Sequence, residues 1–509
     1  MVAYFAYHIY NLCMKKITLS SSDQTFFGLV ADAAFTNPFS EKRQQLDSQI
    51  AGLAGKDKQT GLAWPQVVPV MMEKVRAKLA QLDKVAGGVA AIRAFDGEGN
   101  QELMKYVFLF DVFHHFALHF DALIRKQEKT ADKLLTASFA PKAMEQLTQR
   151  GFTPQEAVRS LALFYQIRRA FYFIQQGLIG QSDCMRQLRM DLWNNIFTYD
   201  IRGYEQYLWD RMEDFATILE GPTGSGKGAA AAAIGKSCFI PFNPADNTFQ
   251  SSFMELFVPA NLSQYAPSLL ESELFGHARG AFTGAVSEHE GLFGLCRPHG
   301  TIFLDEIGEV GPQAQVKLLK VLEERLYTPV GSHKPKRFHG RVIAATNRPV
   351  AELRRDGAFR EDFYYRLCAD CITVPSLAQR IGENPQELAE LVEHFARQIT
   401  SDYNPKLRDK VLEVIRTRLP KGYGWPGNVR ELAQCIRRVI LKDDYQPQEI
   451  PAHSRAEQIK EGLEKSILSA DELVSQYCKL LYDKHSSYQD VARIAGLDWR
   501  TAKKFVVRK

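Results

Sequence analysis

Two hydrophobic patterns divide the chain into regions. From Leu103 to Lys126 and from Pro154 to Gln176, apolar residues recur with the spacing of amphipathic helices. Between residues 215 and 347 the apolar runs are short and continuous, as in buried strands, at 215–220, 300–306 and 341–347. Helical patterns return over 386–450 and again towards the C-terminus. We therefore expect a multidomain protein with a mainly helical N-terminal domain, an α/β centre and helical regions after it.

The composition indicates a soluble globular protein but does not identify its function. The 509 residues are 45% hydrophobic and 24% charged, which is ordinary for a soluble globular protein. A net charge of +5 is too small for the whole chain to bind a polyanion, so any nucleic-acid contact is expected to be a local patch. The stretch Met1–Met14 lacks a basic residue before its apolar run and is too short to span a bilayer. We expect no membrane association.

Two clusters of ligand-type side chains have ordinary structural explanations. Eight cysteines with no repeating spacing indicate reduced thiols and a cytoplasmic location. The pair Cys368 and Cys371 lacks the second pair of a structural zinc site, so a buried strand is the preferred interpretation. A second cluster, on one predicted helix, is preferably a polar stripe, with a metal or haem site as the alternative; it comprises Asp111, His114, His115, His119 and Asp121.

A phosphate-binding loop follows the first predicted strand. Residues 221–228 read GPTGSGKG, between an apolar strand and a helix that starts near Ala229. This context turns backbone N–H groups and a helix N-terminus towards phosphate, while Lys227 reaches the β- and γ-phosphate oxygens. Gly228 departs from the motif, because Ser or Thr normally stands there to bind magnesium. The predicted ATP-binding residues in this loop are Gly221, Pro222, Thr223, Gly224, Ser225, Gly226, Lys227 and Gly228.

An acidic pair at the end of the second strand completes the nucleotide signature. Residues 300–306 read GTIFLDE, an apolar strand that ends in Asp305 and Glu306. In this arrangement Asp305 helps to hold Mg²⁺ and Glu306 polarises the attacking water. Two acids that merely cap the next helix are the alternative, but the upstream Lys227 favours catalysis. The sequence thus predicts an ATPase with ATP and Mg²⁺ as its cofactors.

A glycine-flanked loop, GAFTGA, lies between these two elements. Gly280 and Gly284 permit backbone angles that lift the Phe282–Thr283 tip off the domain, where it can touch a partner. The alternative is an ordinary turn with Phe282 tucked beneath it. In this setting the chain resembles the bacterial enhancer-binding proteins, AAA+ ATPases that activate RNA polymerase carrying sigma-54. The resemblance implies that the loop contacts the sigma factor through Gly280, Ala281, Phe282, Thr283, Gly284 and Ala285.

The resemblance also assigns roles to residues that spacing alone does not identify. It implies that Asn347 senses the γ-phosphate and that Asn243 restrains the catalytic glutamate. Arg360 and Arg366 match the arginine fingers of the family, which implies a ring of subunits, expected to be a hexamer. Arg430, within GNVREL, matches the second sensor and is expected to face ATP. The fold implied is an AAA+ P-loop domain with a parallel sheet and a helical lid.

The C-terminal residues read as a helix-turn-helix. Ser487 is placed to cap one helix, Gly496 to make the turn and Asp498 to cap a second, basic helix. The unit resembles the Fis-type DNA-binding ends of the family. Solvated surface is the alternative, but the turn and the position favour binding to double-stranded DNA. The predicted contacts are Trp499, Arg500, Thr501, Lys503 and Lys504.

Taken together, the motifs predict four domains: 1–175 sensory, 176–385 ATPase, 386–450 lid and 456–509 DNA-binding. The expected function is activation of sigma-54 RNA polymerase at promoters by ATP hydrolysis. Two rivals are a protein-remodelling ATPase with no promoter function and a DNA-binding regulator whose ATPase has decayed to a nucleotide sensor. The intact GAFTGA argues against the first, and Gly228 supports the second.

Overall fold

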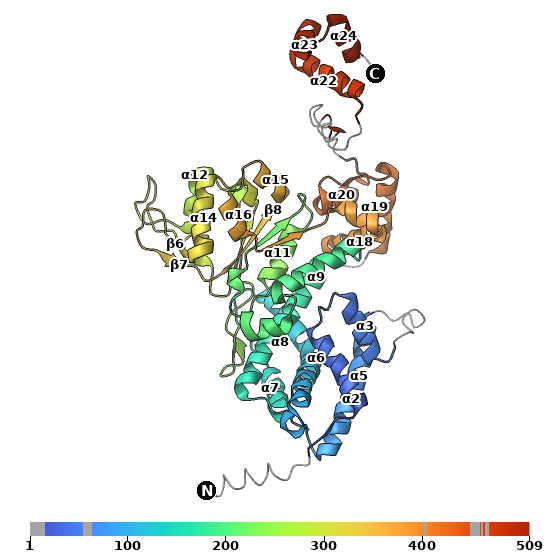
Figure 1. The fold of residues 1–509 in the computed structure, drawn as a ribbon, viewed down its shortest axis with the longest axis vertical. Coiled ribbons are helices and arrows are strands. Elements are labelled where there is room, and N and C mark those ends of the chain that lie inside the picture. The colour runs from blue at the N-terminus through green and yellow to red at the C-terminus, as the bar shows by residue number, and fades with distance from the viewer. Residues whose placement is uncertain are drawn as a thin grey trace. The chain divides into compact units, whose positions relative to one another are not determined.

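The computed structural model describes residues 16–53, 64–400, 404–447 and 468–507, together with 459, 462 and 463. The chain forms two compact units, which are described here separately (Figure 1). The larger comprises Met1–Glu413 with Lys421–Leu441, and the smaller comprises Val414–Pro420 with Lys442–Lys509. The sequence prediction about Met1–Met14 lies outside the described residues.

Helices form the N-terminal region, as the periodicity predicts. They are α2 (Ser21–Phe35), α3 (Glu41–Ile50), α5 (Trp64–Ala86), α6 (Glu98–Thr130), α7 (Ala140–Gln149) and α8 (Pro154–Gly177). Helix α8 starts with a capping box, in which Thr153 and Glu156 bond to each other's backbone N–H groups. Its end at Gly177 lies close to the predicted boundary at residue 175.

Helix α6 is the one described helix that is long and apolar enough to cross a membrane by length and composition. Half of its most apolar window is buried within the protein. Its buried residues join the hydrophobic core of the N-terminal helices, which is the packing of a core helix.

A five-stranded parallel sheet forms the centre of the larger unit. Its strands run in the order β4 (Phe257–Asn261), β5 (Thr301–Asp305), β8 (Arg341–Thr346), β1 (Thr217–Glu220) and β9 (Asp370–Thr373). All four strand pairings are parallel. The carboxyl ends of the strands therefore meet at one edge, where ligands bind in open α/β sheets.

Helices and short hairpins surround this sheet. The helices are α9 (Asp183–Phe197), α10 (Ile201–Gly203), α11 (Lys227–Gly235), α12 (Pro267–Phe275), α13 (Leu292–Leu295), α14 (Pro312–Glu324), α15 (Val350–Arg355) and α16 (Glu361–Leu367). Two antiparallel hairpins join β2 (Phe242–Asn243) to β3 (Thr248–Phe249) and β6 (Leu326–Tyr327) to β7 (Lys336–Arg337). Short non-α turns are Ile92–Ala94, Tyr204–Leu208, Met212–Asp214, Leu262–Gln264 and Ile307–Glu309.

The prediction that Cys368 and Cys371 lie in a buried strand is half wrong. Cys371 is in a strand, β9, but that strand pairs only with β1 and forms an edge of the sheet. Of its four residues only Ile372 is buried, and Cys371 is exposed. An edge strand has one free side, so an apolar run does not by itself guarantee burial.

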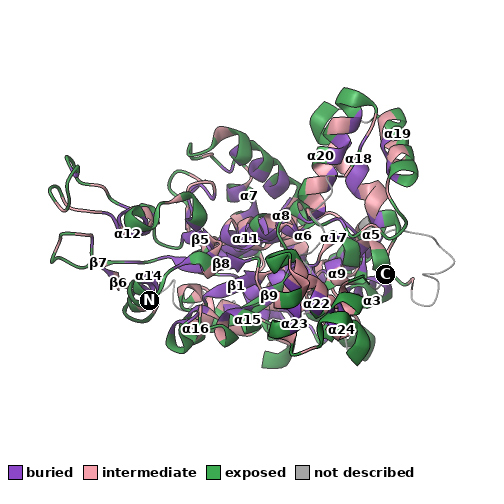
Figure 2. Cartoon of the chain, turned by 90° about the horizontal axis from the view of Figure 1, so that it is seen from above, coloured by how far each residue is buried: buried purple, intermediate pink, exposed green. Residues whose placement is uncertain are grey.

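One continuous hydrophobic core joins the N-terminal helices to one face of the sheet. It includes Phe173 and Ile174 of α8, Ala230 of α11, and Leu219 and Phe303 of the strands. Figure 2 shows this buried interior running from α6 and α8 through α11 to the strands. The predicted sensory and ATPase regions are thus packed as a single body.

Three longer helices follow the sheet in the region predicted as a lid. They are α18 (Gln386–Thr400), α19 (Pro405–Arg418) and α20 (Asn428–Lys442), preceded by the short α17 (Leu377–Glu383). The smaller unit ends in α22 (Ala470–His485), α23 (Tyr488–Ala495) and α24 (Trp499–Val507), around a core that includes Cys478, Leu481, Val491 and Ala502.

Candidate nucleotide, partner and DNA sites

The predicted phosphate-binding loop connects β1 to α11 at the carboxyl edge of the sheet. Gly224 (φ 77°) and Gly226 (φ 113°) adopt backbone angles that residues with a Cβ avoid. The Lys227 ammonium donates to the Gly221 carbonyl (2.7 Å) and to the Pro222 carbonyl (3.2 Å). Burial lowers the pKa of Lys227, and the nearby carboxylates of Asp305 and Glu306 oppose that shift. The loop therefore holds a cation close to the acidic pair.

The loop fits a polyphosphate by two independent features. The first helical hydrogen bonds of α11 run from Ala229 and Ala230 to the Gly226 carbonyl (3.0 and 3.1 Å), so the amides before them are directed outwards at a helix N-terminus. The Ser225 hydroxyl is buried and has no partner among the described residues. Bound phosphate oxygens would accept hydrogen bonds from these amides and from the Ser225 hydroxyl. Gly228 has no side chain to offer a metal, although a Cβ there would meet no atom within 4 Å.

The acidic pair stands at the end of β5, where the sequence predicts it. Glu306 has a left-handed backbone (φ 61°), which is uncommon for a residue with a side chain and is concentrated at functional sites. Its N–H donates to the Asp305 carboxylate (3.0 Å). Burial raises the pKa of Asp305, while Lys227 counteracts the shift. Asp305 and Glu306 are thus only partly solvated and face the loop cation.

Asn347 joins this site from the neighbouring strand. It follows β8, which lies between β1 and β5 in the sheet. Its side-chain amide approaches the Thr223 hydroxyl at 3.5 Å, so it lies at the tip of the phosphate-binding loop. The structure therefore brings together Lys227, Asp305, Glu306 and Asn347.

Asn243, by contrast, is placed apart from the acidic pair. It lies in the β2–β3 hairpin, where its amide donates to Asp246 (3.0 Å) and its carbonyl accepts from the Ala245 N–H (3.1 Å). No described hydrogen bond links it to Glu306. The asparagine that stands beside the acidic pair is Asn261, which ends β4 in register with Asp305. Its side chain accepts hydrogen bonds from Ser263.

Asn243 lies apart because its segment forms a separate two-stranded hairpin. Residues 241–256 precede β4 and include the β2–β3 hairpin, which packs on the N-terminal helices rather than joining the sheet. The Asn247 carbonyl accepts from the Ala137 N–H (2.8 Å), and the rings of Tyr165 and Phe249 stack with centroids 3.9 Å apart. The apolar run that ends in Asn243 therefore belongs to this hairpin, and the strand that pairs with β5 is β4, which follows it in the chain.

The helical lid contacts the phosphate-binding loop through the GNVREL segment. Asn428 donates to the Thr223 carbonyl (2.9 Å) and accepts from the Leu377 N–H (2.9 Å). Val429 donates to the Gly224 carbonyl (3.1 Å). The positive charge of Arg430 adds to the burial that lowers the pKa of Lys227 and opposes the burial that raises the pKa of Asp305, so Arg430 lies near both groups. That Arg430 faces ATP stays a prediction, and Asn428 is a contact that motif reasoning did not single out.

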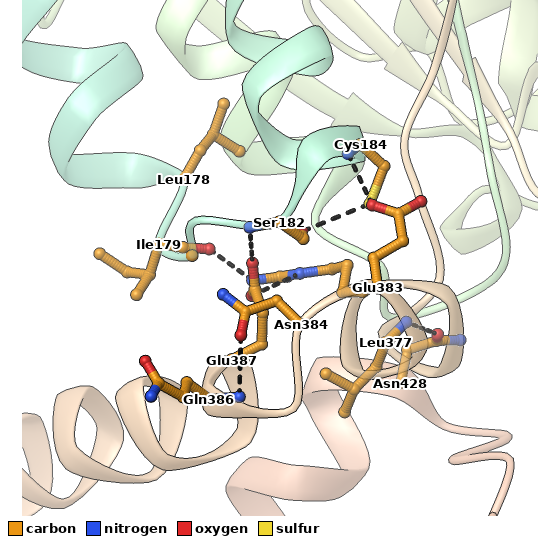
Figure 3. Close-up of polar contacts among 12 residues, drawn as sticks. Leu178, Ile179, Ser182, Cys184, Leu377, Glu383, Asn384, Gln386, Glu387 and Asn428 are labelled. Atoms are coloured by element: carbon orange, nitrogen blue, oxygen red, sulfur yellow. Dashed lines mark hydrogen bonds and ion pairs between the residues drawn. The ribbon is translucent and has the colours of Figure 1, made fainter. Parts of the chain in front are cut away.

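A buried ion pair fixes the lid to the segment that precedes α9 (Figure 3). Glu387 accepts from the Ser182 N–H (2.7 Å) and pairs with Arg380 (2.8 Å), and both side chains are almost fully buried. Arg380 also donates to the Ile179 carbonyl. A Cβ on Gly180 would lie 2.1 Å from a Glu387 oxygen, so only glycine fits there. Sequence spacing could not predict the contact between Glu387 and Ser182, because these residues are 205 positions apart in the chain.

Both predicted arginine fingers are exposed. Arg360, at the start of α16, pairs with Asp362 (2.7 Å), and Arg366 pairs with Glu323 of α14 (2.9 Å). These carboxylates are themselves solvent-accessible, so the pairs are weak and exchangeable. The structure does not bring either arginine to the phosphate-binding loop of its own chain through any described contact.

The GAFTGA loop is closed at its base and open at its tip. His277 and His289 exchange two backbone hydrogen bonds (2.9 and 3.0 Å), and Ala278 donates to the Val330 carbonyl beyond β6 (2.9 Å). Segments next to α12 and β7 extend away from the sheet (Figure 2). Thr283 is exposed and Phe282 is 40% exposed, with its ring edge-on to His277 at 4.9 Å. The tip is therefore accessible to a partner.

The two loop glycines are required by backbone conformation. Gly280 (φ 80°) and Gly284 (φ 102°) have angles that disfavour a Cβ, although neither glycine is crowded. The Gly280 N–H donates to the Ala285 carbonyl (2.8 Å), which closes the hexapeptide on itself.

The smaller unit presents a basic helix. Ser487 accepts from the Asp490 N–H at the start of α23, and Gly496 (φ 65°) makes the turn before α24. Asp498 accepts from the Arg500 N–H (2.9 Å), as a cap should. Ala502 is fully buried. All five predicted DNA contacts are exposed on α24: Trp499, Arg500, Thr501, Lys503 and Lys504.

Comparison with known proteins identifies the central region. Residues 206–373 match the family model described as the sigma-54 interaction domain, and residues 383–467 match the AAA+ ATPase lid domain. The transcriptional regulatory protein GlrR of Escherichia coli (strain K12) is 34% identical over 301 residues, covering 58% of this chain and 63% of GlrR. The Nif-specific regulatory protein of Klebsiella pneumoniae is 37% identical over 263 residues, covering 52% of this chain and 44% of that protein.

This chain covers a larger share of a third relative. An uncharacterized protein in the HyuA 5' region of Pseudomonas sp. (strain NS671) is 38% identical over 229 residues, which are 45% of this chain and 71% of that protein. The chain spans less than two thirds of the two regulators named above.

Proposed function

The chain belongs to the sigma-54-dependent enhancer-binding proteins, and we propose that it binds upstream DNA and uses ATP hydrolysis in a ring to open the sigma-54 RNA polymerase promoter complex. The observation that carries the proposal is a single α/β domain with both a nucleotide site and an accessible GAFTGA tip. Phe282 and Thr283 at that tip are exposed, while Lys227, Asp305 and Glu306 gather at the sheet edge.

The nucleotide would be held by residues of both the sheet and the lid. Lys227 and the amides at the start of α11 would bind the phosphates, and Arg430 would approach them from the lid. Asp305 would hold Mg²⁺, which neutralises charge on the phosphates when bound. Glu306, with its carboxylate at the same edge, would take a proton from the attacking water.

The exposure of Arg360 and Arg366 supports a ring of subunits. A guanidinium that stabilises phosphoryl transfer must reach the phosphates. Arg360, directly before α16, and Arg366, within it, are exposed and have no described contact to the phosphate-binding loop of their own chain. We infer that each serves the site of a neighbouring subunit, in a ring of six.

DNA recognition would fall to α24. Its exposed cations suit phosphate oxygens, and exposed Trp499 and Thr501 suit base edges or sugar. A helix presented beside a capped turn is the arrangement that enters a major groove. The helical N-terminal region would carry the regulatory input.

A second candidate rests on Gly228. The missing metal ligand supports a regulator whose ATPase has decayed to a nucleotide sensor. However, a side chain would fit at this position, so packing does not demand glycine. Steady-state ATP turnover decides between the two: phosphate release above background favours the activator, and none favours the sensor.

Direct binding tests the proposal itself. The wild-type protein, trapped with a transition-state analogue of ATP hydrolysis, is expected to co-migrate with purified sigma-54 in gel filtration. The same protein with ADP is the control and should elute separately. Failure of the trapped form to bind sigma-54 would favour a remodelling ATPase without promoter function.

A further inference from the structure

The helical lid and the phosphate-binding loop pack against each other through their backbones. A Cβ built on Gly224 would lie 2.4 Å from the Gly427 carbonyl oxygen and 3.1 Å from the Arg430 Cβ, so only glycine permits this approach. The Val429 N–H donates to the Gly224 carbonyl (3.1 Å). The lid is therefore close enough to influence the shape of the loop.

Asn428, the first residue of α20, is the side chain that joins the two segments. It is 3% exposed, and its amide nitrogen donates to the Thr223 carbonyl (2.9 Å). Its amide oxygen accepts from the Leu377 N–H at the start of α17 (2.9 Å, Figure 3). Its backbone is left-handed (φ 50°), a conformation that asparagine tolerates better than most residues. One end of this buried amide thus holds the loop, and the other holds the lid.

The contact with Thr223 decides the direction of one loop amide. All described peptide bonds are trans, and in a trans peptide the carbonyl and the following N–H point in opposite directions. Because the Thr223 carbonyl points to Asn428, the Gly224 N–H points away from the lid segment. No described hydrogen bond uses this N–H, so it is free to donate to a ligand.

On the basis of the proposed nucleotide site, we propose that Asn428 is a positioning residue for phosphate: it holds the Thr223 carbonyl from the lid and so turns the Gly224 N–H towards the phosphates of ATP. Backbone N–H groups of glycine-rich loops are effective phosphate donors. Movement of the lid away from the loop would release this peptide and lower the affinity for phosphate. By linkage, a bound nucleotide would favour the attached lid.

Asn428→Gly tests this role, because glycine adopts the left-handed backbone without strain. In the full chain, the fluorescent nucleotide mant-ATP should bind about tenfold more weakly, as expected for the loss of one hydrogen bond to a charged group. The N–H contact would be made both before and during hydrolysis, so KM for ATP should rise while kcat stays near that of wild type. A lid displaced as a whole would misalign the reacting groups and lower kcat instead.

Asn428→Asp is the second variant. It keeps the acceptor for the Leu377 N–H but removes the donor to Thr223, so it should weaken mant-ATP binding at least as much as Asn428→Gly. Gln434→Gly is the matched control, because Gln434 is exposed on the same helix and no described hydrogen bond links it to the loop. Glycine there destabilises α20, yet mant-ATP should bind normally. Circular dichroism establishes that each variant is folded at the assay temperature.

The proposal is overturned if the folded Asn428 variants bind mant-ATP as wild type does, or if Gln434→Gly weakens binding as much as Asn428→Gly. A wild-type protein that binds no mant-ATP would overturn the nucleotide site and this role together. A wild-type protein that binds mant-ATP without hydrolysing ATP would overturn only the proposed ATPase, since the comparison of affinities does not depend on turnover or on sigma-54.

Discussion

The guanidinium of Arg169, on α8, donates to the main-chain carbonyl of Lys236 over 2.6 Å, at the C-terminal end of the helix that follows the phosphate-binding loop. It also donates to the Cys238 carbonyl (2.7 Å), and Gln166 donates to the carbonyl of Ser237 between them (3.0 Å). A cation at a helix C-terminus is favoured by the helix dipole. The N-terminal region and α11 are therefore joined by hydrogen bonds as well as by a shared core.

Replacing Arg169 should weaken the packing of α8 on α11 and so lower the stability of the protein. Arg169 is fully buried, so Arg169→Met would keep most of the volume but deprive the partly buried Lys236 and Cys238 carbonyls of these donors. We expect the free energy of unfolding to fall by about 3 kcal/mol, from two charge-assisted hydrogen bonds. Urea unfolding followed by circular dichroism measures it. Arg125→Met, at an exposed position of α6, is the control and should change stability little. Equal effects of both variants would contradict this role.

The buried pair of Figure 3 makes a second stability prediction. Glu387→Gln would leave the Arg380 charge buried without a counter-ion, because the carboxylate is its only described acidic partner. Breaking a buried ion pair from one side costs about 3–5 kcal/mol. Glu383→Gln is the matched control, since Glu383 is exposed and accepts hydrogen bonds only from neutral groups, the Cys184 N–H and the Gln379 amide, among the described residues. The melting temperature of Glu387→Gln should fall well below that of the control; similar values would contradict the assignment.

Local motifs made the phosphate-binding loop, the acidic pair and the basic C-terminal helix predictable. Their function depends on residues close together in sequence, such as Gly226 and Lys227. The position of Asn243, apart from the acidic pair, was not predictable in this way, because strand register across the sheet decides that Asn261 lies beside Asp305. The Glu387 and Arg169 contacts depend on segments far apart in the chain meeting in space. Periodicity predicts the helices that carry them but not which helices pack together.

Subunit mixing tests the ring. Glu306→Gln should keep ATP binding but slow turnover by about a hundred- to ten-thousand-fold, because water activation is lost. Arg366→Ala should also be slow, although losing an exposed pair with Glu323 should barely affect folding.

If the arginine serves a neighbour, the mixed variants should regain activity. An Arg366→Ala subunit keeps a functional Glu306, and a neighbouring Glu306→Gln subunit keeps a functional Arg366. Phosphate release from the mixture should therefore exceed the sum of the two separate variants. A mixture no more active than that sum, tested with Arg360→Ala as well, would rule out arginines acting between subunits.

DNA binding should be separable from ATP turnover. Arg500 is exposed on α24, so Arg500→Ala is expected to weaken binding of the cognate DNA by about 10- to 100-fold in gel shifts. ATP turnover should be unchanged, because the two sites lie in different compact units. Arg493→Ala, at an exposed position of α23, is the control and should bind nearly normally. Equal losses in both variants would mean that α24 is not the recognition helix.

The central claim is that the exposed GAFTGA tip turns ATP hydrolysis into promoter opening. Thr283→Ala removes one hydroxyl at that tip, and no described contact ties Thr283 to the phosphate-binding loop. Its ATP turnover should therefore stay near that of wild type. A small contact at the centre of a transient interface can carry most of its affinity.

The decisive measurement is open-complex formation by sigma-54 RNA polymerase on a duplex promoter, in the presence of ATP. The wild-type protein is expected to open the promoter, whereas Thr283→Ala, hydrolysing ATP at a similar rate, is expected to fail. Promoter opening by Thr283→Ala at the wild-type rate would contradict the account.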